Sequence, residues 1–171
     1  MMDVVWIAQA VGLVSYVLGI STFYQKNDKR LKMMMVIFNL NHMMHYLLLG
    51  AITSAVSSAL SACRSTLSVK FSSPTLAYGF IACNVLIGLY IVDNPLGWLP
   101  IIGTSIGTYA MFCLQGIRMR IAFIVGATFW LLNNILVGSW GGMLLESTLL
   151  TVNMLTIYRL YRTRPMEEMT R

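Results

Sequence analysis

Charged residues are scarce in this sequence: its 171 residues include twelve Lys or Arg and six Asp or Glu, together 11% of the chain. An ordinary soluble domain carries about 25% charged residues, so a soluble fold is excluded. The three cysteines, Cys63, Cys83 and Cys113, lack the spacing of zinc ligands, and we expect neither a metal site nor a disulfide. Neither an HExxH pair nor a phosphate-binding glycine loop is present, so no cofactor and no enzymatic activity are expected.

Apolar residues make up 57% of the chain, and its mean hydropathy is +0.72. A helix that spans a membrane needs about 20 predominantly apolar residues to cross about 30 Å of hydrocarbon. The sequence contains seven such stretches joined by short connections, at about residues 4–24, 33–52, 53–69, 74–92, 97–115, 121–138 and 140–160. The predicted fold is therefore an all-α membrane domain. The first stretch is expected to be a permanent helix rather than a cleaved signal, because it follows Asp3 and not a basic segment.

Basic residues are confined to one side of this predicted topology. They fall in or around the odd-numbered connections and at the tail: Lys26, Lys29, Arg30, Lys32, Arg64, Lys70, Arg118, Arg120, Arg159, Arg162, Arg164 and Arg171. Asp3 and Asp93 lie on the opposite side. Since basic loops stay in the cytoplasm, the amino terminus is predicted to lie outside and the carboxyl terminus inside. The net charge of +6 then indicates orientation and attraction to anionic lipids, and nucleic acid is not an expected partner.

The two halves of the chain resemble each other at an interval of about 88 residues. Arg30-Leu31-Lys32 matches Arg118-Met119-Arg120, and the segment 45–50 corresponds to 133–138, so both segments end at glycine. The repeats are predicted to be triple-helix units, at about 4–70 and 97–161, with a linker helix at about 74–92 and a cytoplasmic tail at 162–171. A unit of three helices ends on the opposite side of the membrane from where it began, so a second unit placed directly after it would be inverted. The linker helix crosses once more, and the second unit then has the same orientation as the first. The prediction is two parallel triple-helix bundles related by an axis along the membrane normal.

The whole sequence resembles the YgjV-type family of bacterial inner-membrane proteins. The resemblance rests on Gly103-Thr-Ser, on Ile117-Arg-Met-Arg, and on Gly138-Ser-Trp-Gly-Gly-Met-Leu-Leu-Glu146 followed by Asn153. It implies a multi-pass protein of the bacterial inner membrane, without implying a particular activity.

More remotely, the three-one-three layout is similar to the PQ-loop superfamily, which includes sugar facilitators of the SWEET type and vitamin-precursor transporters of the PnuC type. In that superfamily the third helix of each unit lies between the first two. Tyr24-Gln25 and Leu114-Gln115 occupy the places of its Pro-Gln pairs, so the helix-kinking prolines are absent from both repeats. The small residues of the segment 54–62 suit close packing between neighbouring helices.

Two ionisable residues fall inside predicted spans. Glu146 lies six residues, or about 9 Å, below the outer end of its helix, where a carboxylate must be neutralised, hydrated or paired. It is either a proton-carrying site or a group in a structural hydrogen bond. Asn153 follows two turns later on the same face, so both side chains are expected to face one cavity. Arg64 either snorkels to the cytoplasmic surface or marks the inner mouth of that cavity and attracts an anionic group.

A polar stripe marks the second predicted span, where His42 and His45 are three residues apart and share a helix face. The repeat places Trp130 opposite His42 and Asn133 opposite His45. Hydrogen-bonded structure is one interpretation of these residues. The other is a binding site for a small polar molecule, formed by His42, His45, Arg64, Trp130, Asn133, Asn134, Glu146 and Asn153.

These observations favour a transporter or facilitator of a small polar solute, passive or proton-linked, with its cavity between the two triple-helix units. Membrane lipids and the solute are the expected partners, and the oligomeric state is left open between one chain and several. The alternative is a non-transporting scaffold or receptor that binds a partner protein or a lipid. A third hypothesis is an intramembrane metalloenzyme with His42, His45 and Glu146 as its ligands.

Overall fold

The computed structural model describes residues 2–23, 28–71, 73–114 and 116–168. Within these ranges the chain is helical and contains no strand, which confirms the all-α prediction. The elements are α1 (Met2–Phe23), α2 (Asp28–Leu48), α3 (Ile52–Ser68), α4 (Pro74–Ile91), the short 3-10 helix η1 (Pro95–Gly97), α5 (Trp98–Cys113), α6 (Gly116–Val137) and α7 (Trp140–Glu168). Lys26, Arg171, the pair Tyr24-Gln25 and Gln115 lie outside the described residues.

Each predicted span coincides with one helix, but three helices extend past the predicted boundaries. α2 begins at Asp28 instead of about residue 33, α6 begins at Gly116 instead of 121, and α7 continues to Glu168 instead of ending near 160. Basic residues occupy these extensions. Lys and Arg are good helix formers although they are unfavourable in hydrocarbon, so hydropathy marks only the apolar part of each helix. The connections and tail predicted as loops are therefore partly helical.

Local residues fix several helix ends. Gly50 and Gly138 have φ values of 73° and 71° at the two tight turns between α2 and α3 and between α6 and α7, a left-handed conformation that favours glycine. The Ser73 hydroxyl accepts a hydrogen bond from the backbone N–H of Thr75 at the start of α4. The side chain of Asn94 accepts hydrogen bonds from two backbone N–H groups of η1. The glycines that end the two matching repeat segments thus lie at tight turns, and side-chain caps begin α4 and η1.

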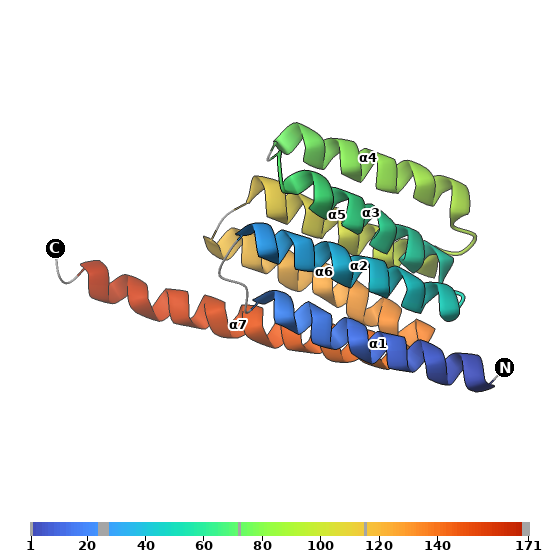
Figure 1. Cartoon of the computed structure of the whole chain (residues 1–171). Coiled ribbons are helices and arrows are strands. Elements are labelled where there is room, and N and C mark those ends of the chain that lie inside the picture. The colour runs from blue at the N-terminus through green and yellow to red at the C-terminus, as the bar shows by residue number, and fades with distance from the viewer. Residues whose placement is uncertain (1, 24–27, 72, 115, 169–171) are drawn as a thin grey trace.

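The helices form two layers of three, packed face to face (Figure 1). One layer contains α1, α2 and α3 in that order, and the other contains α7, α6 and α5, so that α1 packs against α7 and α3 packs against α5. α4 covers the edge formed by α3 and α5. Within each layer the middle helix is the second of its unit, α2 or α6. The PQ-loop resemblance implied the third helix in this position, and this order is not the one found.

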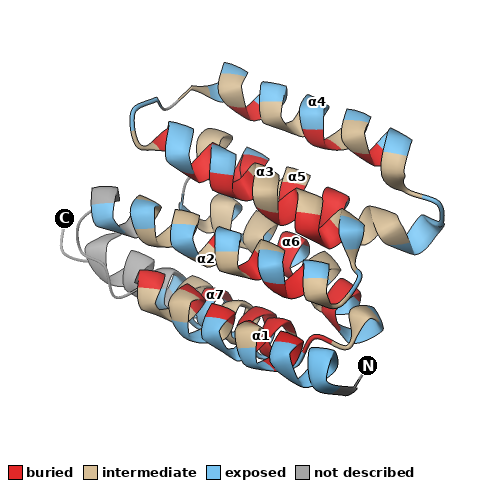
Figure 2. Ribbon diagram, turned by 45° about the vertical axis from the view of Figure 1, so that its right-hand side comes forward, coloured by how far each residue is buried: buried red, intermediate tan, exposed pale blue. Residues whose placement is uncertain are grey.

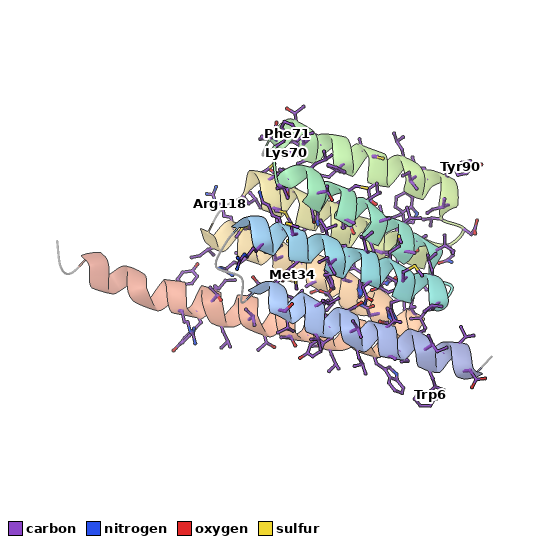
Figure 3. All side chains as sticks on the ribbon, viewed as in Figure 1. Trp6, Met34, Lys70, Phe71, Tyr90 and Arg118 are labelled. Atoms are coloured by element: carbon purple, nitrogen blue, oxygen red, sulfur yellow. The ribbon has the colours of Figure 1, made fainter. Side chains whose placement is uncertain are left out.

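Successive helices run in opposite directions, so the two ends of the chain lie at opposite ends of the bundle (Figure 1). Lys70 and Arg118 lie at the end where α7 terminates, whereas Trp6 and Tyr90 lie at the other end (Figure 3). Asp93 follows Tyr90 at the end of α4. The charge asymmetry of the sequence therefore corresponds to the two ends of the bundle.

Apolar side chains cover the outside of the bundle, and polar side chains fill much of its interior. Exposed residues lie on the outward sides of α1 and α4, while buried residues face inward (Figure 2). Leu86 and Leu89 of α4 are 66% and 67% exposed, whereas the serines of α3 are mostly buried. Among the described residues, four helical segments are long and apolar enough to cross a membrane: Asp3–Thr22, Pro74–Ile91, Pro95–Cys113 and Gly116–Val137. This inverted distribution is typical of a protein surrounded by lipid.

Candidate functional site

α2 and α6 meet in the middle of the two layers through buried side chains. The phenol of Tyr46 donates a 2.6 Å hydrogen bond to Oδ1 of Asn134, and both residues are 0% exposed. The Tyr46 ring stacks on the Trp130 ring, with 5.7 Å between the ring centroids. It also packs against the His42 ring in a T-shaped arrangement, with 4.5 Å between the centroids. We call this group the central polar cluster; it consists of His42, His45, Tyr46, Trp130, Asn133 and Asn134.

His45 ties the central polar cluster to α1 and α7. Its Nδ1 lies 2.7 Å from the carbonyl oxygen of Ala8, and its Nε2 lies 2.6 Å from the hydroxyl of Ser139. Because a carbonyl oxygen only accepts, Nδ1 carries a proton and donates to it. When the ring is neutral, Nε2 accepts a hydrogen bond from the Ser139 hydroxyl. The Ser139 oxygen also accepts a 3.1 Å bond from the backbone N–H of Gly142, so it caps the start of α7.

Asn133 makes the corresponding connection from α6 to α3. The hydroxyl of Ser54, in the first turn of α3, donates a 3.1 Å hydrogen bond to Oδ1 of Asn133. Asn133 occupies the position of His45 in the 88-residue repeat. The middle helix of each unit therefore bonds to the start of the third helix of the other unit.

Gln9 and Gly12 bring α1 close to this region. The Gln9 amide donates a 2.7 Å bond to the carbonyl of Gly138 and accepts a 3.1 Å bond from the backbone N–H of Trp140. A Cβ atom at Gly12 would lie only 2.6 Å from the ring of His45. The absence of a side chain at residue 12 thus allows the imidazole to lie against α1.

Three nitrogen atoms of the central polar cluster are buried without a hydrogen-bond partner among the described residues: His42 Nδ1, Asn133 Nδ2 and Asn134 Nδ2. An amide nitrogen can only donate, so Asn133 and Asn134 present unused N–H groups. Leaving such groups unpaired in a protein interior is costly. A bound molecule with hydroxyl or carbonyl oxygens would satisfy them.

Glu146 lies at the edge of the central polar cluster. It is 7% exposed on α7, and its carboxyl group is close enough to interact electrostatically with the phenol of Tyr46. Among the described residues, no hydrogen bond or ion pair involves the Glu146 carboxyl group. Its environment therefore offers no fixed partner for a negative charge.

Arg64 and Asn153 are not part of this group. Arg64 donates a 2.6 Å hydrogen bond from Nη1 to the hydroxyl of Thr108 on α5. Oδ1 of Asn153 accepts a 3.4 Å bond from Arg120 of α6, well along α7 from Glu146. The structure thus gathers five predicted site residues, His42, His45, Trp130, Asn133 and Asn134, places Glu146 beside them and separates the other two.

No metal site is assembled in the part of the chain that the structure describes, where no three His, Cys, Asp or Glu side chains come together. Both ring nitrogens of His45 already have partners, and Glu146 does not join the two histidines. His42, His45 and Glu146, the ligands of the metalloenzyme hypothesis, thus do not form such a group in this part of the chain.

Three residues of the site were not among those selected from the sequence: Gln9, Tyr46 and Ser139. Tyr46 had a detectable signal, because the 88-residue repeat pairs it with Asn134. Ser139 follows a glycine at a helix start, which is a typical capping position. Gln9 had no such signal, since nothing in the sequence places it beside Gly138 and Trp140, which are 129 and 131 residues further along the chain.

Comparison with known proteins gives a consistent relationship over nearly the whole chain. The model of the Imp-YgjV family, described as bacterial inner membrane protein, matches residues 6–164. The chain is also similar to the inner membrane protein YgjV of Escherichia coli (strain K12), at 32% identity over 161 residues, which covers 94% of this chain and 88% of that protein. No solved structure matches the chain.

Proposed function

The chain belongs to the Imp-YgjV family of bacterial inner membrane proteins, and we propose that it carries a small polar solute across that membrane. In this proposal all seven helices cross the bilayer, with the amino terminus outside and the carboxyl terminus in the cytoplasm. The position of Lys70 and Arg118 at one end of the bundle and Asp93 at the other supports this orientation (Figure 3).

A duplicated architecture supports a path between the two units. Each helix of the first unit has an equivalent in the second: α1 corresponds to α5, α2 to α6, and α3 to α7. The contact between α1 and α7 is therefore equivalent to the contact between α5 and α3, and both are present. The packing of α2 against its two neighbours likewise corresponds to that of α6. This is the pattern of an approximate two-fold axis along the helices, between α2 and α6, with α4 outside it. Interfaces between parallel repeats are known locations of substrate paths.

The observation that carries the proposal is a set of nitrogens at this axis, on His42, Asn133 and Asn134, that have no partner within the described part of the chain. They lie where the two units meet, inside a bundle whose outer surface is apolar. The layer formed by Tyr46, Trp130 and His42 closes the path in this conformation. We infer a neutral solute with several hydroxyl or carbonyl oxygens, because such oxygens match the free amide donors.

Glu146 supplies the proton-linked form of the mechanism. Its carboxyl group is buried within electrostatic range of Tyr46 and has no hydrogen-bond or ion-pair partner among the described residues, so its gain or loss of a proton would change the charge near the path. Coupling of that proton to solute movement is part of this proposal.

Osmotic swelling of reconstituted vesicles tests the proposal with neutral polyols, monosaccharides and small amides. Vesicles with the native protein should swell faster than protein-free vesicles for at least one of these solutes. His42→Phe should reduce that rate about tenfold, because the ring keeps its stacking contacts but loses a polar nitrogen at the axis. Thr128→Val is the matched control, since Thr128 is exposed on α6 and bonds to its own helix.

Failure of every solute to enter faster than it enters protein-free vesicles would remove transport as the function. A scaffold or receptor that binds a partner protein or a lipid would then be favoured. Equal swelling with His42→Phe would leave transport in place but would remove His42 from the path.

A further inference from the structure

A second polar site lies away from the axis, between α3, α4 and α5. A small cavity is present there, with about 10 Å³ of space for the centre of a water-sized group, which corresponds to roughly one water molecule. Its lining includes Arg64 and Ser61 of α3, Phe80 of α4, and Thr104 and Thr108 of α5. This cavity is separate from the central polar cluster, which lies between α2 and α6.

The cation in this cavity has no counter-charge. Arg64 is 7% exposed, and no described residue forms an ion pair with it. It lies four residues, or about 6 Å, before the end of α3 at Ser68, and its low exposure shows that its side chain is packed between helices at this end of the bundle. A charge at such a position is strongly unfavourable unless it is paired.

Hydrogen bonding leaves part of the guanidinium free to bind a ligand. Nη1 donates to the hydroxyl of Thr108 at 2.6 Å, and that hydroxyl donates in turn to the carbonyl of Thr104 at 2.7 Å. These bonds fix the orientation of the side chain. Nε of Arg64 is buried and has no partner among the described residues, and the same holds for the buried hydroxyl groups of Thr104 and Ser65.

These groups together have the chemistry of an anion site. A guanidinium N–H and a threonine hydroxyl both donate to an anion, and Leu60 and Phe80 provide an apolar wall. The neighbouring amide of Asn84 does not compete, because its two N–H groups bond to the carbonyl of Ile101 and to Ser105. The cavity has room for one small group, so a single halide ion or one oxygen of a phosphate could enter it, whereas a complete phosphate or a sugar could not.

We propose that a monovalent anion of about the size of chloride binds between α3, α4 and α5, on Arg64 Nε and the hydroxyl of Thr104. The bound anion neutralises Arg64 and joins α3 to α5. This site does not depend on transport along the central axis, and its test does not measure transport.

Thermal unfolding of detergent-purified protein provides the test, with sodium chloride, bromide or gluconate added at constant ionic strength. Chloride and bromide should each raise the unfolding midpoint by roughly 3 °C at tenfold excess over the dissociation constant, because they bind only the folded state. Gluconate is too large for the cavity and should produce no rise. An equal midpoint in all three salts would overturn the proposal.

Variants locate the effect. Arg64→Gln removes the charge and should abolish the halide-dependent rise, and Thr104→Val should weaken halide binding about tenfold by removing one donor. Arg118→Gln is the matched control, because Arg118 is exposed at the same end of the bundle. A rise retained in full by Arg64→Gln would contradict the assignment. If that variant does not fold, Thr104→Val still decides, since unchanged halide affinity there would equally contradict it.

A lipid phosphate is the competing source of negative charge. Native protein in bilayers of neutral phosphatidylcholine should still respond to chloride, and replacing half of that lipid with anionic phosphatidylglycerol should leave the response unchanged. If the anionic lipid alone raises the midpoint and abolishes the response to chloride, the bound group is a lipid phosphate and the free-anion proposal is wrong.

Discussion

The hydroxyl of Tyr46 donates a 2.6 Å hydrogen bond to Oδ1 of Asn134, which lies one repeat interval of 88 residues further along the chain. Equivalent positions of two repeats come into direct contact only where they lie next to the symmetry axis that relates them. His42 and Trp130, also 88 residues apart, lie at 6.4 Å in the same place. The contact between α2 and α6 is thus the point where the two halves of the bundle meet.

Removing the Tyr46 hydroxyl should destabilise the bundle. Tyr46→Phe leaves the buried Oδ1 of Asn134 without its donor, and we expect a loss of about 1–3 kcal/mol in the free energy of unfolding. Denaturant titration in mixed micelles measures this loss. Tyr90→Phe is the control, because Tyr90 is 92% exposed and should change stability by less than about 0.5 kcal/mol. Equal effects of the two variants would show that the Tyr46 bond is not important for folding.

Close packing of α1 against α2 makes Gly12 sensitive to substitution. Gly12→Ala would place a methyl group 2.6 Å from the ring of His45, which is held by two hydrogen bonds and cannot turn away freely. We expect Gly12→Ala to lower the free energy of unfolding by about 1–3 kcal/mol. Gly79→Ala has open space around the added methyl group, so that variant should be neutral or slightly stabilising. The prediction is wrong if the thermal midpoints of the two variants agree.

Two serine caps provide a matched comparison. Ser139 caps α7 and also donates to His45 when the imidazole is neutral, whereas Ser73 caps α4 without a further side-chain partner among the described residues. Ser73→Ala should therefore cost about 1 kcal/mol, and Ser139→Ala about 1–3 kcal/mol more. Unfolding followed by circular dichroism gives both values. A smaller loss at Ser139 than at Ser73 would rule out the bond to His45 as a stabilising contact.

Reporter fusions test the orientation in the membrane. Green fluorescent protein fused after the last residue should fluoresce, and alkaline phosphatase at the same place should be inactive, because the basic end of the bundle is expected in the cytoplasm. Phosphatase inserted after Asp93 should be active, since that turn lies at the opposite end. The reverse pattern at both places would invert the proposed topology.

Proton linkage depends on Glu146. Glu146→Gln keeps the shape of the side chain but cannot bind or release the proton, so uptake driven by a pH gradient should be lost while downhill flux remains. Vesicle uptake with and without the gradient separates the two quantities. Asp3→Asn serves as the control, because Asp3 is exposed at the start of α1. Gradient-driven uptake by Glu146→Gln at the native rate would exclude this role.

The extent of agreement between sequence and structure differs from feature to feature. The repeat correctly anticipated that Gly50 and Gly138 end equivalent helices, because each requires a conformation that other residues rarely adopt. It also identified most of the central polar cluster. It did not identify Gln9, and it did not separate Arg64 and Asn153 from the cluster, because these positions depend on which helix face meets which neighbour.

By itself, the sequence determined the existence of the helices, the ends at which basic residues gather and the pairing of equivalent segments. These are properties of single segments, set by transfer of apolar side chains into lipid and by the backbone preferences of individual residues. Only the tertiary structure decided that α2 and α6 are the middle helices, and that Arg64 lies at the edge covered by α4 instead of with His42 at the centre. Lipid and neighbouring helices are similarly apolar, so hydropathy does not distinguish them. The choice is made by close contacts and buried hydrogen bonds, such as those at Gly12 and Ser139, which form only when the helices pack together.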